Sequence, residues 1–438
     1  MNDPLFYARA IHFAASIMVA GVVFFIVFVA EPAFRHTKDD ARVAVAVRIR
    51  LAWIAWIGLV VALASGVPWL VIVAESMSGQ PLGALTSQGI LWTVLTQTDF
   101  GNDWLLRLVL ACALGGLFVH FLSVKGVTSL GLKAVTAVLA AALVGSLAWA
   151  GHAIGGQGVE GFVHPAADVL HLIAAAAWAG ALVPLAVLLT MTGPHAAGLA
   201  AARTATQRFS TLGIVSVAAL LLTGTVNAWY LVGSVSALTG TDYGRLLLVK
   251  LTLFAGMVGI AAFNWSRLTP RLLQNADATG AQRAWRQLRR NAAIEAAMGA
   301  LVICIVATLG ILPPASHVHE HGRPGAIPAD ASFQHIHTEN GMADVTVEPG
   351  HVGVAGVTIH LWDAEENALD AQQLTLTLAP PTAGGNPITR PAVQDSDGLW
   401  HVDGIELSQP GNWMVTIDAV LGPGKRLTLA APIVIDAK

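Results

Sequence analysis

The sequence predicts an all-α polytopic membrane bundle of eight transmembrane helices, followed by an all-β sandwich of the immunoglobulin-like type. Three observations predict this architecture. Of the 438 residues, 55% are hydrophobic and only 12% are charged, whereas soluble domains carry charge on about a quarter of their residues. Eight apolar runs reach the length of about 20 residues that crosses a bilayer. After Pro313 and Pro314, short runs separated by turn residues replace the long apolar ones.

The membrane domain is predicted over residues 1–315. Its first apolar run has no positively charged segment before it and is long enough to span the bilayer. We therefore interpret it as a retained helix rather than a cleaved signal peptide. The eight expected spans are 8–30, 51–74, 104–123, 132–151, 165–191, 209–232, 246–264 and 291–312.

Lysine and arginine fall in alternate loops between these spans. The loop after the first span contains five of them, whereas the loops 75–103, 152–164 and 233–244 contain none. Positively charged loops stay on the cytoplasmic side of a membrane. Both termini are therefore predicted to lie outside the cytoplasm.

The membrane domain also contains an internal repeat. Three segments of its first half match three segments of its second half in the same order. Since each half holds four spans, both have the same orientation, which predicts two parallel four-helix repeats about an axis along the membrane normal. The repeats cover about 5–151 and 165–312, and the matched segments are 12–21 with 171–180, Ser65-Gly66 with Thr223-Gly224, and 98–107 with 241–250.

The remaining chain is predicted to lie outside the membrane. Residues 316–341 form a polar linker, and residues 342–438 form a sandwich of roughly seven strands with Trp413 in its core. Histidines that alternate with other residues in the linker are typical of metal capture with low selectivity. These candidate ligands are His317, His319, His321, His335 and His337.

Metal-competent side chains gather at the otherwise apolar start of the fifth span. His164, Asp168 and His171 follow one another at i, i+4 and i+7, which places them on one helix face. His152 ends the fourth span on the same side of the membrane. The repeat makes His12 equivalent to His171, with each roughly 10 Å along a helix that starts outside. Together they predict a ladder of metal ligands that descends to His171, with His12 facing it.

The chemistry of these side chains supports a metal-binding ladder, and two structural roles are the alternatives. Imidazole is a ligand for copper, zinc, iron and nickel, and a carboxylate suits a hydrated divalent ion. Ionisable groups inside a membrane are costly and usually face a cavity or the bundle interior. Alternatively, His164 and Asp168 cap their helix near the interface, and His171 bonds to a neighbouring helix.

Other charged groups occupy the spans. Arg107 and Lys250 each follow the glycine of a TD[FY]G motif by six residues. Their side chains either extend to the interface or pair with Asp99 and Asp242. Glu295 enters the eighth span and is expected to pair with a cytoplasmic arginine such as Arg290, the alternative being a carboxylate at the exit of a pathway.

The segments TDFGNDWLLR, DVLHLIAAAAWAGALVPL, RFSTLGIVSVAALLLTGTVNA and TDYGRLLLVKL resemble the CopD family of bacterial copper-resistance proteins. The resemblance covers residues 5–315. It implies a multi-pass inner-membrane protein that moves copper ions, in many cases inward from the periplasm, beside a periplasmic copper-binding protein. The C-terminal domain is similar to YtkA-like or CopC-like sandwiches. A fused CopC domain usually comes first, whereas this sandwich follows the membrane domain.

These observations predict copper import through the ladder, with both termini periplasmic. No nucleophile elbow, P-loop or HExxH motif occurs, so we expect no enzyme activity, and no basic block suggests nucleic acid. Two alternatives remain. His12 and His171 could be the two axial ligands of a haem b, or the chain could be a copper sensor or assembly factor that transports nothing.

Overall fold

The chain forms two compact units, residues 1–321 and 322–438, which are described separately. The first is helical and the second is built of strands. The computed structural model describes residues 4–34, 41–78, 82–87, 89–123, 129–150, 160–193, 196–273, 278–310, 312, 328, 330–338, 341–363, 368–381, 386–395, 398–422 and 425–437.

The described part of the first unit contains eight helices that are long and apolar enough to cross a membrane, which confirms the predicted bundle. Several of these helices extend beyond the apolar runs, because the polar residues that flank a run also adopt helical conformation. The helical elements are α1 (Pro4–Phe25), η1 (Ile26–Ala30), α2 (Glu31–Phe34), α3 (Ala41–Ser78), α4 (Leu82–Ser87), α5 (Ile90–Gln97), α6 (Asp99–Ser123), α7 (Leu130–Gly145), η3 (Ser146–Ala150), α8 (Glu160–Trp178), α9 (Leu182–Thr192), α10 (Ala196–Val232), α11 (Val235–Gly240), α12 (Asp242–Phe263), η5 (Asn264–Leu268), α13 (Thr269–Leu273) and α14 (Ala278–Leu309).

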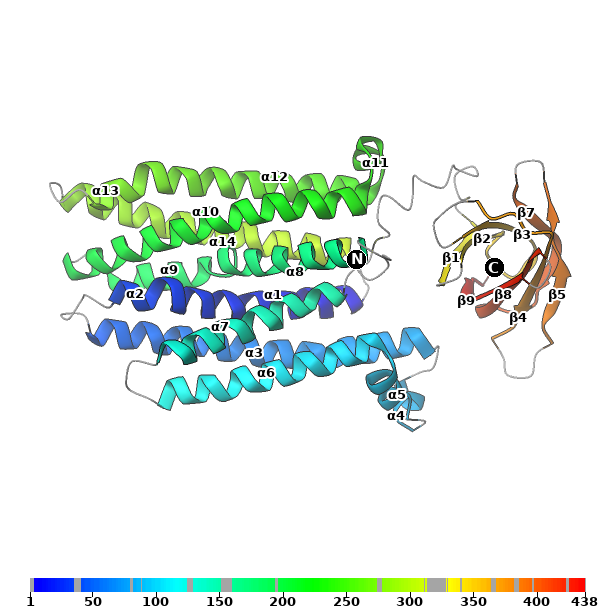
Figure 1. Ribbon diagram of the computed structural model, residues 1–438, viewed down its shortest axis with the longest axis horizontal. Coiled ribbons are helices and arrows are strands. Elements are labelled where there is room, and N and C mark those ends of the chain that lie inside the picture. The colour runs from blue at the N-terminus through cyan, green and yellow to red at the C-terminus, as the bar shows by residue number, and fades with distance from the viewer. Residues whose placement is uncertain are drawn as a thin grey trace. The chain divides into compact units, whose positions relative to one another are not determined.

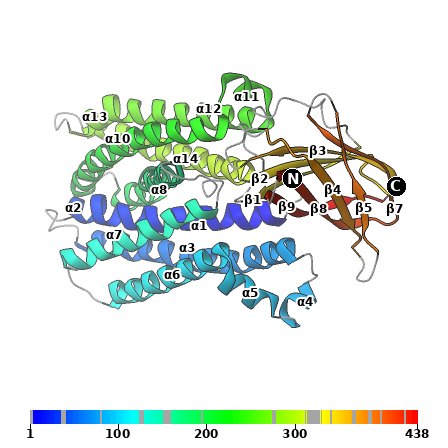
Figure 2. The ribbon, with the colours of Figure 1, turned by 45° about the vertical axis from the view of Figure 1, so that its right-hand side comes forward.

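Helix α1 occupies the interior of this bundle. In Figures 1 and 2 it runs between α3 and α6 on one side and α10, α12 and α14 on the other. In the most apolar 18-residue stretch of the span that contains α1, 72% of the residues are buried. In the corresponding stretch of the span that contains α12, 6% are buried. This difference in burial shows that α1 is central, whereas α12 has most of its apolar surface on the outside.

The backbones of α1 and the α8–α9 junction touch where two glycines meet. A Cβ atom on Gly21 would lie 2.3 Å from the carbonyl carbon of Gly180, and one on Gly180 would lie 2.5 Å from the Ile17 carbonyl oxygen. Small residues allow such close approach of helices in membranes. The predicted repeat aligns Gly21 with Gly180, so their contact is compatible with an axis between the halves. The repeat as a whole stays a prediction.

The second unit is a pair of antiparallel sheets, as the alternating runs predict. One sheet has the order β1-β2-β3-β7-β6 and the other β5-β4-β8-β9. Trp413 is 1% exposed, which confirms it in the core between them. The strands are β1 (Ser332–Thr338), β2 (Gly341–Glu348), β3 (Gly353–Trp362), β4 (Gln373–Ala379), β5 (Ile388–Pro391), β6 (Val393–Gln394), β7 (Trp400–Leu407), β8 (Gly411–Gly422) and β9 (Lys425–Ile435).

Strand β1 lies inside the segment expected to be a linker, so the sandwich starts before Met342. It pairs along its whole length with β2. Ile336 is 3% exposed and packs in the core, whereas His335 is half-buried on the other face. His335 and His337 therefore lie in a strand and not in a linker, because the alternation that suggested metal capture is also the period of a strand.

Candidate functional site

His12 lies in the interior of the bundle, where residues of α3 hold its ring in place. Its side chain is 6% exposed, and Nδ1 lies 2.9 Å from the carbonyl oxygen of Ala62 and 3.3 Å from Ser65 Oγ. A carbonyl oxygen only accepts hydrogen bonds, so Nδ1 carries the proton and Nε2 carries the lone pair. Within the described part of the chain, this buried Nε2 has no hydrogen-bond partner. It is therefore a neutral imidazole nitrogen that is available as a ligand.

His171 has the same tautomer for a different reason. Its Nδ1 lies 2.9 Å from Thr223 Oγ1 on α10. The Thr223 hydroxyl donates its only proton to the Ala219 carbonyl oxygen, 2.7 Å away. The hydroxyl oxygen must then accept from Nδ1–H of His171, which leaves the lone pair on Nε2.

A glycine lies beside each imidazole ring, at a distance where a Cβ atom would make an ordinary van der Waals contact with the ring. A Cβ atom on Gly66 would lie 3.6 Å from His12 Cε1, and one on Gly224 would lie 3.4 Å from His171 Cε1. The sequence analysis aligned Ser65-Gly66 with Thr223-Gly224 but did not identify their role. In each half, the hydroxyl group of this pair lies within hydrogen-bonding distance of the histidine Nδ1, and the glycine lies beside the histidine ring. The signal was present as a small-residue pair at nearly the same offset from each histidine, 53 residues after His12 and 52 after His171.

The ladder residues of α8 all face α10, as their spacing predicts. The ring of His164 stacks on Tyr230 with 4.9 Å between centroids and 16° between planes. Asn227 Nδ2 donates to Asp168 Oδ1 at 3.0 Å. His171 bonds to Thr223, so a neighbouring-helix contact, the alternative stated above, occupies its Nδ1.

The partners on α10 escaped the sequence analysis. Thr223, Asn227 and Tyr230 are spaced by four and three residues, which puts them on one face of α10. Their order is reversed relative to the ladder, as expected for antiparallel helices. A polar stripe in an apolar span was the signal that could have identified them.

Neither cation forms the ion pair that the sequence analysis gave as one of two alternatives. Arg107, 4% exposed, forms its ion pair with Asp103, one turn away on α6, and not with Asp99, two turns away. Asp242 pairs at 3.5 Å with the exposed Arg245 and not with Lys250. In both cases the nearer charge on the same helix is the partner, because residues three or four positions apart are neighbours on a helix.

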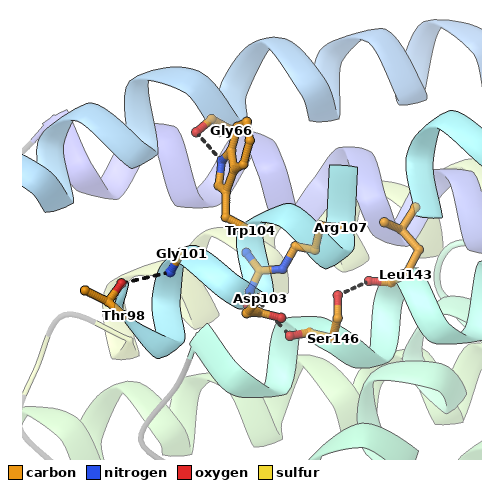
Figure 3. A network of polar contacts seen from close by, with 8 residues as sticks. All are labelled: Gly66, Thr98, Gly101, Asp103, Trp104, Arg107, Leu143 and Ser146. Carbon is orange, nitrogen blue, oxygen red and sulfur yellow. Dashed lines mark hydrogen bonds and ion pairs between the residues drawn. The ribbon is translucent and has the colours of Figure 1, made fainter. Parts of the chain in front are cut away.

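Each cation instead lies near the histidine of its own half. Arg107 and His12 contact the same indole ring, with Arg107 Cζ 5.1 Å and the His12 ring 5.2 Å from the ring of Trp69. Lys250 lies close enough to His171 and Asp168 for its charge to interact with both. Figure 3 shows Arg107 beside Asp103 and Ser146, with Trp104 Nε1 donating to the Gly66 carbonyl oxygen at 2.9 Å.

Two buried carboxylates lie away from the ladder. Glu31, which the sequence analysis missed, pairs with Arg48 at 2.6 Å and Lys133 at 2.9 Å. Glu295 accepts from Asn264 Nδ2 at 2.9 Å, so its partner is an amide and not the predicted Arg290. The arginines that precede Glu295 on α14 lie in the polar first turns of that helix. Asn264 lies opposite Glu295 on η5.

The described residues contain no group of three or more histidine, cysteine, aspartate or glutamate side chains close enough to hold a metal ion. Successive rungs of the ladder are separated by about one helical turn, or roughly 5.4 Å. His12 and His171 are held by different helices, and within the described residues they share no hydrogen bond or ring contact. His152, His317, His319 and His321 lie outside the described residues, as does the side chain of His337.

On the sandwich, His335 has a carboxylate neighbour. Its Nδ1 lies 2.6 Å from Asp344 Oδ1. The strand register places His335, Asp344 and His360 in one row across β1, β2 and β3. The sequence alone does not place His360 in this row, because the row depends on the order of the strands.

Comparison with known proteins identifies the membrane domain. The profile described as Copper resistance protein D matches residues 203–309, and that of the Copper resistance protein D-like N-terminal domain matches residues 1–162. Copper resistance protein D of Pseudomonas syringae pv. tomato is 32% identical over 319 residues, which cover 72% of this chain and 98% of that protein.

Two further relatives differ in how much of the chain they cover. Inner membrane protein YebZ of Escherichia coli (strain K12) is 35% identical over 224 residues, which cover 51% of this chain and 72% of YebZ. Copper transport protein CutJ of Bacillus subtilis (strain 168) is 25% identical over 421 residues, which cover 94% of this chain and 71% of CutJ. No solved structure shows significant similarity.

Proposed function

This chain belongs to the copper resistance protein D family, and we propose that it moves copper ions across the inner membrane from the periplasm to the cytoplasm. The observation that carries this proposal is the shared tautomer of His12 and His171. In both, an oxygen atom of a neighbouring helix accepts from Nδ1–H, which leaves the lone pair on Nε2 for a metal ion. Histidines that bind metals usually donate their other ring nitrogen in this way.

Copper would enter along the face of α8. Asp168 offers a carboxylate oxygen to a hydrated ion, and one turn deeper His171 offers its Nε2. Thr223 and Asn227 keep both side chains in place from α10. Because each rung supplies a single strong ligand, no rung binds the ion so tightly that it cannot leave, which conduction requires.

Lys250 fits this pathway as a charge balance. Its positive charge lies close enough to interact with Asp168 and His171 when no copper is bound. A copper ion that arrives between these groups would replace part of that interaction, so the carboxylate is never left buried without a positive neighbour. A lone carboxylate at this depth would be costly.

We expect His171→Ala to abolish copper uptake. The measurement is total cell copper in copper-fed bacteria that carry empty vector, wild type or the variant at equal expression. Wild type should raise cell copper above the vector level and His171→Ala should not. A fall below the vector level would indicate export, and equal copper in all three would contradict transport.

Thr223→Val tests the tautomer. It keeps the shape of the side chain but removes the oxygen that accepts from His171 Nδ1–H, and the loss of such a second partner weakens metal binding roughly 10–100-fold. We expect lower uptake at limiting copper. Thr225→Val, at an exposed threonine two residues along α10, is the matched control. Equal losses in both variants would assign the effect to helix stability.

A haem protein remains the alternative to be excluded by spectroscopy. The bonds that fix Nδ1 of His12 and His171 would suit a haem iron as well as copper. We expect the purified protein to show no Soret band, because the family models and the named relatives are those of copper proteins. A Soret band that His12→Ala removes would overturn copper transport in favour of haem b.

A further inference from the structure

A groove of about 450 Å³ lies between α3, α9 and α14. On α9 it is lined by residues at positions i, i+3, i+4, i+7 and i+8, which share one face of the helix. These residues are Val183, Ala186, Val187, Thr190 and Met191. From the first to the last, this face extends roughly 12 Å along the helix axis. The volume falls in the range of small-molecule sites, about 300–1,000 Å³.

The lining of the groove is almost entirely apolar. Ala293 and Ala296 complete it from α14, and their short side chains leave space that a larger residue would fill. Apart from Thr190 and Arg50, the lining residues that the structure describes are aliphatic or methionine, and none is a histidine or a carboxylate. Since lipid tails are as apolar as aliphatic side chains, this lining suits an acyl chain rather than an ion.

Positive charge marks one end of the groove. Arg50 lines it from α3, directly before the apolar run of the second span. Arg289 precedes Ala293 by four residues and Ala296 by seven, so it continues the same face of α14. Both arginines are exposed, and neither forms an ion pair with any residue that the structure describes. The spans of α3 and α14 begin at the end of the bundle where the span of α9 finishes, so both arginines lie toward one end.

A tryptophan holds Arg289 beside the groove. The Cζ atom of Arg289 lies 5.2 Å from the ring of Trp285, and the ring Nε1 donates to the Leu189 carbonyl oxygen on α9 at 3.0 Å. Leu189 directly precedes the lining residue Thr190. Two guanidinium groups from different helices therefore flank the end of an apolar groove, an arrangement that matches the charged head group and apolar chain of a phospholipid.

We propose that this groove binds one anionic phospholipid, with an acyl chain along α9 and α14 and its phosphate between Arg50 and Arg289. The guanidinium group suits this role because its planar fork donates two parallel N–H bonds to a phosphate. Both arginines lie at the end of the bundle that the charge pattern predicts to face the cytoplasm. Basic pockets between membrane helices on that side bind anionic head groups.

The bound lipid would stabilise the half of the fifth span that lies away from the ladder. α9 continues the span that starts with α8, and both belong to residues 162–192. An acyl chain in the groove fills the space between α9, α3 and α14 and so fixes α9 against its neighbours. The site lies outside the proposed copper pathway and does not depend on it.

Lipid binding is measured on the purified full-length protein in detergent by native mass spectrometry. The probes are phosphatidylglycerol and phosphatidylethanolamine with the same acyl chains. Wild type should bind the first phosphatidylglycerol at least roughly tenfold more tightly, because only this head group brings a net negative charge to the two arginines. Arg50→Gln/Arg289→Gln should lose this preference.

The control for this variant removes the same charge elsewhere. Arg208→Gln/Arg271→Gln changes two exposed arginines of α10 and α13 that do not line the groove, and it should keep the preference of wild type. A preference that both double variants lose equally would assign it to the general positive charge of the bundle and would overturn the proposed site.

A second pair of variants tests the groove itself. Ala296→Leu fills the space for the acyl chain, so the first molecule of either lipid should bind more weakly. Ala297→Leu, at the next residue of α14, which is exposed and outside the lining, should bind like wild type. The proposal is overturned if wild type shows no preference for phosphatidylglycerol, or if Ala296→Leu binds lipid like Ala297→Leu. A dimer of wild type that Ala296→Leu dissociates would also overturn it, because the occupant would then be a second copy of the chain.

Discussion

Gly21→Ala is expected to destabilise the membrane domain severely. The new methyl group would lie 2.3 Å from the backbone carbon of Gly180, and a backbone cannot move aside as a flexible side chain can. Overpacking of a core typically costs about 1–3 kcal/mol. Because α1 is the central helix, we expect a cost at or above the upper end of this range, seen as a lower thermal unfolding midpoint in detergent.

Gly116→Ala is the matched control for this experiment. Gly116 also lies within a spanning helix, α6, but no atom lies within 4 Å of the position its Cβ would take. The same methyl group there should leave the unfolding midpoint unchanged or raise it slightly, because alanine favours helix over glycine. Equal midpoints for Gly21→Ala and Gly116→Ala would contradict the close crossing of α1 and the α8–α9 junction.

Glu31→Ala is the second change with a large expected effect. It leaves Lys133, whose side chain is 7% exposed, buried without its carboxylate partner. Breaking a buried ion pair from one side costs about 3–5 kcal/mol. We expect little folded protein after detergent extraction, measured as the monodisperse fraction in size-exclusion chromatography.

Removing both charges should restore much of this loss. In Glu31→Leu/Lys133→Leu, no charge remains unpaired in the interior, and Arg48 keeps access to water because its side chain is 38% exposed. Replacing buried ion pairs with apolar residues is often neutral. If the double variant is as poorly folded as Glu31→Ala, the cost does not come from the unpaired Lys133.

Much of the fold follows from local patterns in the sequence. The eight spans were recognisable because an apolar run of sufficient length has few alternatives to a membrane helix. The strands of the sandwich were recognisable by alternation, with Trp413 inside. The prediction failed at β1, where the alternating histidines were interpreted as a metal-capture linker although Ile336 between them faces the core.

The candidate site was only half predictable. That His164, Asp168 and His171 share a face follows from the helical period, since it depends on one helix alone. That α10 receives this face with Thr223, Asn227 and Tyr230 depends on which helices become neighbours. The ion pair of Arg107 with Asp103 was predictable in principle from their spacing, but the TD[FY]G motif drew attention to Asp99.

The sequence by itself therefore determined the class of the protein, its eight spans, its sandwich, its family and the candidate ligands of α8. Only the tertiary structure decided which nitrogen of His12 and His171 carries the lone pair, and that Arg107 and His12 meet at Trp69. The physical reason is the range of the interactions. Hydrophobic periodicity acts within one segment, whereas a tautomer or a shared contact is set by atoms that packing brings from distant helices.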